Sequence, residues 1–527
     1  MQAPFRNEPL TDFSDPSQET AFKRALAEVE GKLGGSYPLI IGGRRQTAEL
    51  EFSSIDPAAP EVVVGRFPRA DTTAALRALE AAIEAFPLWS RRSTEERAQY
   101  LFRAAEQVRK KRHELSAWMV YEVGKTWSEA DGEVAEVVDL FEYYGRQALE
   151  LAGPQTGKLA KVPDEDTDFF YIPLGAGVIV SPWNFPLALT FGMASAAIVT
   201  GNTVVIKPAS SSPTSVAQLL EVFLGLGLPP GVLNLVTGSG GSVGDPLIED
   251  PRTRFVAFTG SIEVGIAINE KAARVQLGQT WIKRTILEMG GKNAVIVDRE
   301  ADLDLAVEGV VASAFGYQGQ KCSAGSRAII DASIYDDFLE RLVDRAGRLR
   351  VGSPTEPNVD LGPVIDESAQ KSILAYIDIG RKEGRLLLGG EKLSRKGYFV
   401  QPTIFADVRP DAVLAQEEIF GPVLACIKAR DFDEALQIAN GTKYGLTGAL
   451  FSRNPNKLSR ARTEFHTGNL YFNRKSTGAL MGVHPFGGFN MSGTDSKAGG
   501  PDYLLLFMQG KSIGAKKSVT EDGRRLG

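Results

Sequence analysis

The sequence predicts an α/β fold made of two consecutive open-sheet domains. Its 527 residues exceed the about 250 to 300 residues at which a single hydrophobic core stops growing. From about residue 171, short apolar runs alternate with helical stretches such as residues 212–223; the runs are GVIVSP, TVVIKP, VLNLV and FVAFTG. This alternation is typical of parallel strands joined by crossover helices. A second such series begins at TILEMGGKNAVIVD, includes a predicted helix over residues 303–315, and ends near residue 480. In such sheets we expect ligands beyond the carboxyl ends of the strands.

The first quarter of the chain is predicted to be helical. Residues 71–86 place apolar side chains on one helix face, and Ser93 with Glu96 forms a capping box that opens the next helix. A third helix is predicted over residues 129–149. One side of it carries Glu129, Glu133 and Glu136. The pattern alone favours a solvent-exposed acidic face for these glutamates.

Charge and hydropathy exclude several classes of partner. The formal net charge is -6 and the pI about 5.5, so the basic stripe that nucleic-acid binding requires is missing. The first residues, MQAPFRNEPLTDFSDPSQ, have no apolar signal region, and no uncharged apolar run reaches the about 18 residues of a membrane span. We therefore expect a cytoplasmic protein that acts on a small molecule, without nucleic acid or membrane as partner.

The two cysteines have contrasting neighbours. Cys426 lies in the apolar run PVLACIKA, as a core cysteine does, whereas Cys322 lies in the polar, glycine-rich stretch GYQGQKCSAG. This contrast argues against a disulfide. The three histidines, His113, His466 and His484, have no zinc-type spacing, so we predict no metal site.

Two glycine clusters follow predicted strands, TGSGGSVGD and FTGSIEVGIA. The first lacks the dinucleotide fingerprint, because Val243 stands where the last glycine is needed. The second is no Walker loop, because Ile266 replaces the phosphate-binding lysine. Either could be an ordinary tight turn, but TGS at a strand end also offers backbone N–H groups to a pyrophosphate.

Several short stretches, taken together, resemble the aldehyde dehydrogenase superfamily in order and spacing. They are SPWNFP (181–186), IKPAS (206–210), LEMGGKN (287–293), the cysteine stretch, EEIFGPV (417–423) and PFGG (485–488), and the resemblance covers residues from about 40 to about 510. It implies two Rossmann-like open α/β domains plus a small projecting oligomerisation hairpin. The NAD(P)-binding domain would comprise residues 1–150 and 174–290, the catalytic domain 291–488, and the oligomerisation or bridging region 151–173 and 489–527. A homodimer or an assembly of dimers is expected.

The resemblance also implies three catalytic roles. Cys322 would be the nucleophile, because a thiolate adds readily to a carbonyl and leaves from a thioester. Asn184 and the backbone N–H of Cys322 would stabilise the oxyanion. Glu288 would activate water, since an apolar setting raises the pKa of a carboxyl group toward neutrality. Without the family, Asn184 would be interpreted as a turn residue and Glu288 as an ion-paired glutamate.

A nicotinamide cofactor is implied by the same stretches. Lys207 would bind the adenosine ribose, Gly260 and Ser261 the pyrophosphate, and Glu418 with Phe420 the nicotinamide ribose and ring; Trp183 is a further expected cofactor contact. Many relatives that use NAD have glutamate where this chain has Ser210. NAD is expected, and NADP stays open.

The stretch after residue 470, NRKSTGALMGVHPFGGFNMSG, and the KCS at the nucleophile resemble one branch of the superfamily. That branch oxidises glutamate 5-semialdehyde, formed from 1-pyrroline-5-carboxylate, to glutamate in proline catabolism. There the N–H groups of Gly478 and Ala479 and the Ser323 hydroxyl would bind the substrate's α-carboxylate, as a backbone nest does. Phe185 and Phe486 would pack on its aliphatic chain, and Glu136 would face its ammonium group. The alternatives are another semialdehyde dehydrogenase, such as one for succinate semialdehyde, or a non-catalytic binding protein on the same fold.

Overall fold

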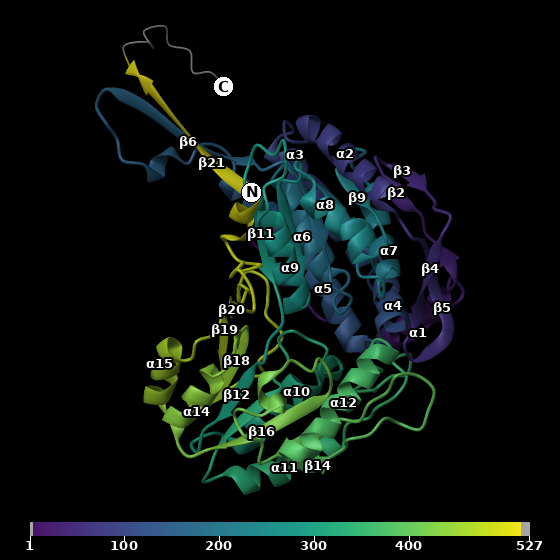
Figure 1. Ribbon diagram of the computed structural model, residues 1–527, viewed down its shortest axis with the longest axis vertical. Coiled ribbons are helices and arrows are strands. Elements are labelled where there is room, and N and C mark those ends of the chain that lie inside the picture. Colours follow the sequence, from purple (N-terminus) through teal and green to yellow (C-terminus); the bar gives the residue numbers. More distant parts are fainter. Residues whose placement is uncertain (1–3, 518–527) are drawn as a thin grey trace.

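Each of two seven-stranded sheets forms the centre of one lobe of the computed structural model, which describes residues 4–517 (Figure 1). The first sheet has the order β11-β10-β7-β8-β9-β2-β3, that is, Arg284–Glu288, Phe255–Thr259, Ala176–Val180, Thr203–Lys207, Leu233–Leu235, Leu39–Ile41 and Arg44–Gln46. Its strands from β11 to β9 are parallel, and β2 runs antiparallel to both neighbours. The predicted α/β fold class is confirmed.

Helices cover both faces of this sheet. The helices of this lobe are α1 (Pro16–Glu30), α2 (Thr72–Trp89), α3 (Thr94–Lys110), α4 (Arg112–Val123), α5 (Trp127–Leu151), α6 (Ala188–Val199), α7 (Pro213–Gly225), α8 (Asp245–Glu249) and α9 (Ile262–Ala273). Alternate strand residues enter two cores: Val178 and Val205 pack toward α2, whereas Ile179 and Ile206 join the core that includes α5 and α6. Burial on both faces explains the unbroken apolar runs of these strands.

The prediction of a wholly helical first quarter is wrong for residues 35–68. These form β1 (Gly35–Ser36), β2, β3, β4 (Glu51–Asp56) and β5 (Ala59–Pro68), with β5 between β1 and β4. The β4–β5 register shifts on both sides of Ile55, and such irregularities break the two-residue alternation by which a strand is recognised. The predicted helices from residue 71 onward and the Ser93–Glu96 capping box are confirmed.

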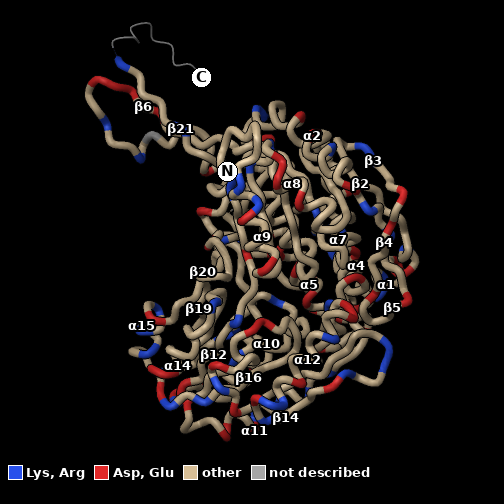
Figure 2. The backbone as a smooth tube through the Cα atoms, in the orientation of Figure 1, with Lys and Arg blue, Asp and Glu red and all other residues tan. Residues whose placement is uncertain are grey.

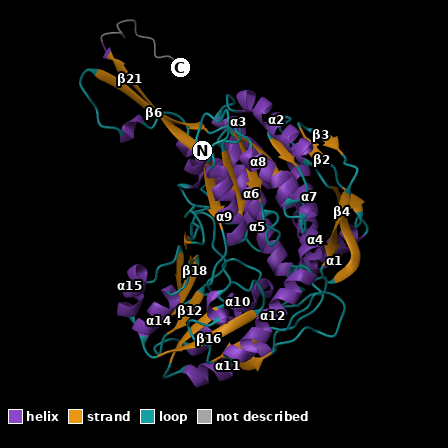
Figure 3. Cartoon of the chain, viewed as in Figure 1, coloured by secondary structure: helices purple, strands orange, loops and turns teal. Residues whose placement is uncertain are grey.

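The second sheet has the order β14-β15-β16-β13-β12-β18-β19 and is parallel except for β14 (Figure 3). These strands are Arg385–Leu388, Thr403–Ala406, Val423–Ala429, Arg327–Asp331, Ala294–Val297, Thr447–Phe451 and Asn469–Phe472. The helices around it are α10 (Leu303–Phe315), α11 (Tyr335–Gly347), α12 (Glu367–Glu383), α13 (Val413–Gln416), α14 (Phe432–Asn440) and α15 (Pro455–Glu464). A short ribbon of β17 (Tyr444–Gly445) and β20 (Phe489–Asn490) adjoins them.

A projecting arm extends away from both lobes. It consists of β6 (Glu165–Pro173) and β21 (Met508–Lys516), which pair in antiparallel register although they lie far apart in the sequence (Figure 1). The predicted excursion near residues 151–173 therefore includes a strand whose partner is the C-terminal strand.

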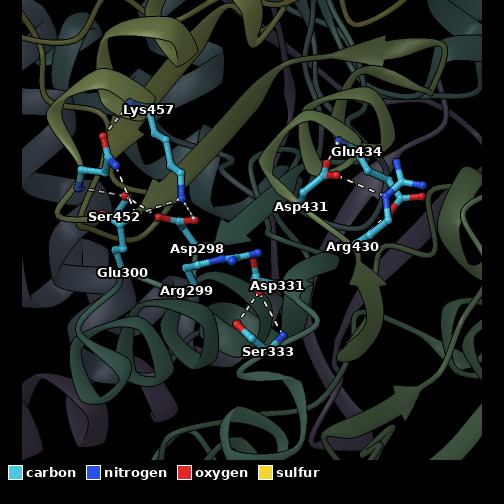
Figure 4. A network of polar contacts seen from close by, with 11 residues as sticks. Asp298, Arg299, Glu300, Asp331, Ser333, Arg430, Asp431, Glu434, Ser452 and Lys457 are labelled. Atoms are coloured by element: carbon cyan, nitrogen blue, oxygen red, sulfur yellow. Dashed lines mark hydrogen bonds and ion pairs between the residues drawn. The ribbon is translucent and has the colours of Figure 1, made fainter.

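The two sheets present opposite ends to the space between the lobes. Lys207 and Glu288 end strands of the first sheet, whereas Cys322 precedes β13 of the second. The carboxyl ends of the second sheet carry an ion-pair network instead (Figure 4). There Lys457 Nζ lies 2.6 Å from Asp298 Oδ1, and Arg299 Nε lies 3.0 Å from Asp331 Oδ2. The expected site residues Lys207 and Glu288 lie at carboxyl ends of the first sheet, whereas paired charges occupy that edge of the second; the expectation of ligands at carboxyl ends stays a prediction.

Acidic and basic residues are interspersed over both lobes (Figure 2). Within residues 4–517, none of the helices combines the length and the hydropathy that a membrane span needs. The same residues contain no group of three or more His, Cys, Asp and Glu side chains that could hold a metal ion.

Candidate active site

Two loops, one from each lobe, meet at the predicted nucleophile. The WNFP loop (residues 181–186) follows β7, and the cysteine loop (residues 316–322) precedes β13. Asn184, which is 4 % exposed, donates from Nδ2 to the carbonyl oxygen of Gln320 at 2.9 Å. The side-chain amide of Asn184 therefore lies beside the backbone that leads directly into Cys322.

The cysteine loop begins with a strained turn. Tyr317 and Gln318 have φ angles of 52° and 57°, in the left-handed region that non-glycine residues rarely adopt. Tyr317 donates its hydroxyl to the Val123 carbonyl at 3.0 Å, and Gln318 Nε2 donates to the Pro363 carbonyl at 2.7 Å. These contacts offset the backbone strain and fix the approach of the chain to Cys322.

Cys322 is held by its backbone, and the residue as a whole is partly exposed. Asn293 Nδ2 donates to the Cys322 carbonyl at 2.7 Å and to the Ala324 carbonyl at 2.8 Å. Loss of hydration raises the pKa of the thiol to about 12, and the charges of Glu418 and Glu288 add to this rise. The resting group is therefore a neutral thiol, which must lose its proton to attack a carbonyl.

Glu288, the last residue of β11, is 9 % exposed. Its Oε1 accepts from Ser496 Oγ at 2.7 Å and from Ser496 N at 3.2 Å, and its Oε2 accepts from Gly488 N at 3.2 Å. Burial raises the pKa of Glu288 to about 7 against the opposing effect of these hydrogen bonds. A carboxyl group with this pKa suits general-base chemistry at neutral pH.

The predicted adenosine and pyrophosphate contacts surround the ends of β8 and β10. Lys207 is 8 % exposed, burial lowers its pKa, and its only hydrogen-bond acceptor among the described residues is the Pro208 carbonyl at 3.3 Å. Ser210 is exposed, and Ser261 caps the N-terminus of α9. The N–H of Gly260 is not free, because it donates to the Glu288 carbonyl at 3.1 Å and extends the strand pairing by one residue.

The predicted nicotinamide contacts come from both lobes. Glu418 Oε1 accepts from Gly291 N at 2.9 Å, and burial raises the pKa of Glu418 to about 7. A Cβ at Gly290 would lie 2.0 Å from Glu418 Oε2, so any other residue there would displace the Glu418 carboxylate. Trp183 and Phe420 meet edge to face, with ring centroids 5.6 Å apart. Trp183, Glu418 and Phe420 thus lie near one another, as a site for a flat ring would need.

The predicted carboxylate contacts have unused hydrogen-bonding groups. Among the described residues, the Ser323 hydroxyl and the N–H groups of Gly478 and Ala479 make no hydrogen bond. Gly478 has a φ of 77°, and Arg474 Nη2 donates to the carbonyls of Thr477 and Gly478 at 2.8 and 2.9 Å. Arg474 therefore occupies the carbonyl groups of this turn and leaves its N–H groups for another acceptor.

Phe185 and Phe486 are both partly exposed. Phe185 stands edge to face with Tyr317, at 6.0 Å between centroids. Phe486 is fixed by two backbone hydrogen bonds with Ala498, at 2.8 and 2.7 Å.

The solvent-exposed interpretation of the acidic helix face is wrong. Glu133 is 1 % exposed, and Glu129 accepts two hydrogen bonds from Lys321 Nζ, at 2.8 and 2.7 Å. Burial raises the pKa of Glu136 to about 7, as does the charge of Glu133, and Glu136 has no ion-pair partner within residues 4–517. The face is acidic because it lines the interior, where it meets lysines from other segments.

Sequence reasoning missed several residues that contact the site: Lys125, Glu129, Glu133, Asn293, Lys321, Arg474 and Ser496. Asn293 lies inside the LEMGGKN stretch and Lys321 directly precedes Cys322, so adjacency could have indicated both. Ser496 contacts Glu288 across 208 positions, and nothing local in the sequence indicates that pairing.

Comparison with known proteins agrees with the resemblance found in the sequence. Residues 44–513 match the sequence profile of the Aldehyde dehydrogenase family. The chain is 57 % identical over 515 residues to the 1-pyrroline-5-carboxylate dehydrogenase of Geobacillus thermodenitrificans, covering 97 % of this chain and 99 % of that protein. A Thermus 1-pyrroline-5-carboxylate dehydrogenase with bound NAD superposes with a TM-score of 0.96 at 50 % identity, covering 98 % and 99 % of the two chains.

A third similarity is to a longer protein. Proline utilization A of Bdellovibrio bacteriovorus matches with a TM-score of 0.95 at 43 % identity, covering 97 % of this chain but 53 % of that one. The profile match, the high identity over almost the whole length and the arrangement around Cys322 lead to one conclusion: the chain belongs to the aldehyde dehydrogenase family.

Proposed function

We propose that this protein is a 1-pyrroline-5-carboxylate dehydrogenase, which oxidises L-glutamate 5-semialdehyde to L-glutamate with NAD. The observation that carries the proposal is a set of unused donors in two segments that meet at Ser323, where Ser476 Oγ donates to the Ser323 carbonyl at 3.2 Å: the Ser323 hydroxyl and the N–H groups of Gly478 and Ala479. Together they match the two oxygens of a carboxylate, as a backbone nest does, and the side chains of Arg474 and Lys475 lie close to Gly478. The names of the Geobacillus and Thermus relatives support the same substrate.

The reaction divides into two steps at Cys322. The thiol proton passes to Glu288, the sulfur adds to the aldehyde carbon, and the resulting oxyanion receives hydrogen bonds from Asn184 Nδ2 and the Cys322 N–H, a contribution of about 3 to 4 kcal/mol per donor in comparable sites. When bound, a nicotinamide cofactor accepts the hydride that this carbon loses. Glu288, with its pKa of about 7, then removes a proton from the water that attacks the Cys322 thioester, and the thiol leaves.

The residues present fit such a cofactor. Within residues 4–517 the buried Lys207 ammonium has a single weak acceptor, so it can donate to ribose hydroxyls. Glu418 can accept from a second ribose, and Trp183 and Phe420 supply aromatic surface nearby. NAD is proposed because the Thermus relative was solved with it, while the exposed Ser210 offers no charge that would repel a 2'-phosphate.

The test is a steady-state comparison of glutamate 5-semialdehyde with succinate semialdehyde, each with NAD and with NADP. We expect the highest kcat/KM for glutamate 5-semialdehyde with NAD, and no NADH formation by the Cys322→Ala variant. Preference for succinate semialdehyde would favour the alternative of another semialdehyde dehydrogenase. Binding without turnover by the wild-type protein would favour a non-catalytic binding protein.

We further propose a homodimer, or an assembly of dimers, that forms through the projecting arm. Most side chains of β21 are exposed, including Ile513 at 41 %, and both strands have an unpaired edge among the described residues. Light scattering of the wild-type protein and of a variant without the arm would test this.

The proposed cytoplasmic location is supported by two free cysteines, as expected in a reducing compartment. The domain limits 1–150 with 174–290, 291–488, and 151–173 with 489–527 likewise stay proposals.

A further inference from the structure

A buried ion pair outside the reacting groups connects the WNFP loop to the cysteine loop. Lys125 is 0 % and Glu133 1 % exposed, and Lys125 Nζ donates to Glu133 Oε2. Lys125 lies between α4 and α5, and Glu133 lies two turns into α5. Neither residue is adjacent in sequence to the loops that it contacts, so the pair is a tertiary feature of this fold.

The second oxygen of Glu133 caps the helix that follows the WNFP loop. Glu133 Oε1 accepts from Leu187 N at 2.7 Å and from Ala188 N at 3.0 Å. These are the first N–H groups of α6, and the N-cap residue Leu187 has no side chain that could accept them. Since Asn184 lies three residues before this cap, Glu133 fixes the end of the loop that carries the oxyanion donor.

Lys125 contacts aromatic rings from both loops. Its Nζ lies 3.6 Å from the ring centroid of Phe185 and 4.8 Å from that of Tyr317. Both distances are within the range of a cation–π interaction, which is stronger when the cation is desolvated. Phe185 directly follows Asn184 in the WNFP loop, and Tyr317 opens the strained turn of the cysteine loop. One ammonium group therefore contacts both the loop with the oxyanion donor and the loop with the nucleophile.

Stability alone is a poor explanation for such a pair. The desolvation of two buried charges often cancels their attraction, and apolar replacements of similar volume are frequently as stable. The charges here hold several groups in a defined geometry. The Glu133 carboxylate accepts from Lys125 and from two helix N–H groups at once, and the Lys125 ammonium faces two rings. We propose that Glu133 and Lys125 are positioning residues that set the distance and orientation of Asn184 and Phe185 relative to Cys322. The proposal rests on the aldehyde oxidation proposed above.

The first experiment compares Glu133→Gln with a matched control on the same helix. In Glu133→Gln the amide oxygen can still cap α6, but the amide nitrogen meets Lys125 as a second donor, so Lys125 must move. We expect kcat to fall about tenfold or more, a part of the about 10²–10³-fold effect of losing an oxyanion donor, with KM for NAD unchanged. The control is Asp131→Asn, which breaks a buried pair with Arg112 (2.5 Å) on the other side of α5 and should lower stability but keep kcat.

The second experiment is a pair of double variants. If Glu133 acts through Asn184, Glu133→Gln adds little to the loss in Asn184→Ala. Lys125→Met combined with Glu133→Gln removes both charges and keeps the cap, but it also removes the ammonium group that faces Phe185 and Tyr317, so kcat should stay at or below that of Glu133→Gln alone. Should Glu133→Gln not fold, the charge-free double variant in the wild-type and Asn184→Ala backgrounds decides.

Three results would overturn the proposal: equal kcat losses in Glu133→Gln and Asp131→Asn, multiplicative losses with Asn184→Ala, or a wild-type kcat in the charge-free double variant. All variants are assayed with glutamate 5-semialdehyde and with a simple aliphatic aldehyde. A wild-type protein that oxidises only the simple aldehyde would contradict the proposed substrate, yet the positioning effect would still be measured with that aldehyde.

Discussion

Removing the hydroxyl of Ser496 should move the pH dependence of the reaction to higher pH. Ser496 is 3 % exposed, and its Oγ donates the shortest of the hydrogen bonds to Glu288, at 2.7 Å. These bonds lower the pKa of Glu288, while burial raises it to about 7. Ser496→Ala removes one of the hydrogen bonds that lower the pKa of Glu288 and leaves its burial unchanged, so this pKa rises further.

The size of the shift follows from the energy of the lost bond. A hydrogen bond to a charged group contributes about 1.5 to 3 kcal/mol, and one pKa unit corresponds to about 1.36 kcal/mol. Because the N–H groups of Ser496 and Gly488 remain, we expect the lower end of that range, or about one unit. At about pH 7 the deprotonated fraction of Glu288 then falls from about a half to about a tenth. Thioester hydrolysis should slow about fivefold at that pH and recover above about pH 9.

The assay is kcat as a function of pH, with the NADH burst followed separately by stopped flow. Thr494→Val is the control, because the Thr494 hydroxyl accepts from Leu287 N at 3.0 Å and has no hydrogen bond to the Glu288 carboxylate. Its pH profile should match that of the wild-type protein. A midpoint for Ser496→Ala that stays in place, or moves to lower pH, would refute this account of the Glu288 pKa.

Three further outcomes are expected. Glu288→Gln should give a rapid NADH burst followed by slow turnover, since hydride transfer precedes water attack; absence of both the burst and a thioester detectable by mass spectrometry would remove Glu288 from hydrolysis. Ser323→Ala should raise KM for glutamate 5-semialdehyde more than for a simple aldehyde, and equal changes would argue against a carboxylate contact. In cofactor-free protein, Glu418→Gln should speed the alkylation of Cys322 by iodoacetamide, because the charge of Glu418 raises the pKa of that thiol; an unchanged rate would contradict this electrostatic coupling.

Local patterns in the sequence predicted much of the fold and the reacting groups. The helix over residues 303–315 was predicted with the bounds that the structure shows, because its apolar spacing and its Asp302 cap are both local. Contacts between residues that lie far apart in the sequence could not be predicted from local patterns. Glu133 caps a helix that begins 55 positions later, and its spacing along α5 is the same whether that face meets water or lysines. The acidic pattern was therefore assigned to the surface, although the partners that make it an interior face come from other segments.

The electrostatics of the site couple its proton transfers. Glu288 and Glu418 both have a pKa near 7, and the charge of each raises the pKa of Cys322. A thiolate formed beside two charged carboxylates would concentrate three negative charges in a poorly hydrated space, which is unfavourable. If the thiol proton passes to Glu288, the total charge stays constant, and of the three repulsive pairs only that between the thiolate and Glu418 remains. The same carboxyl must release that proton before it can activate water, so a pKa near neutrality serves both directions of transfer, whereas a fully exposed glutamate near 4.3 would be a poor acceptor for the first.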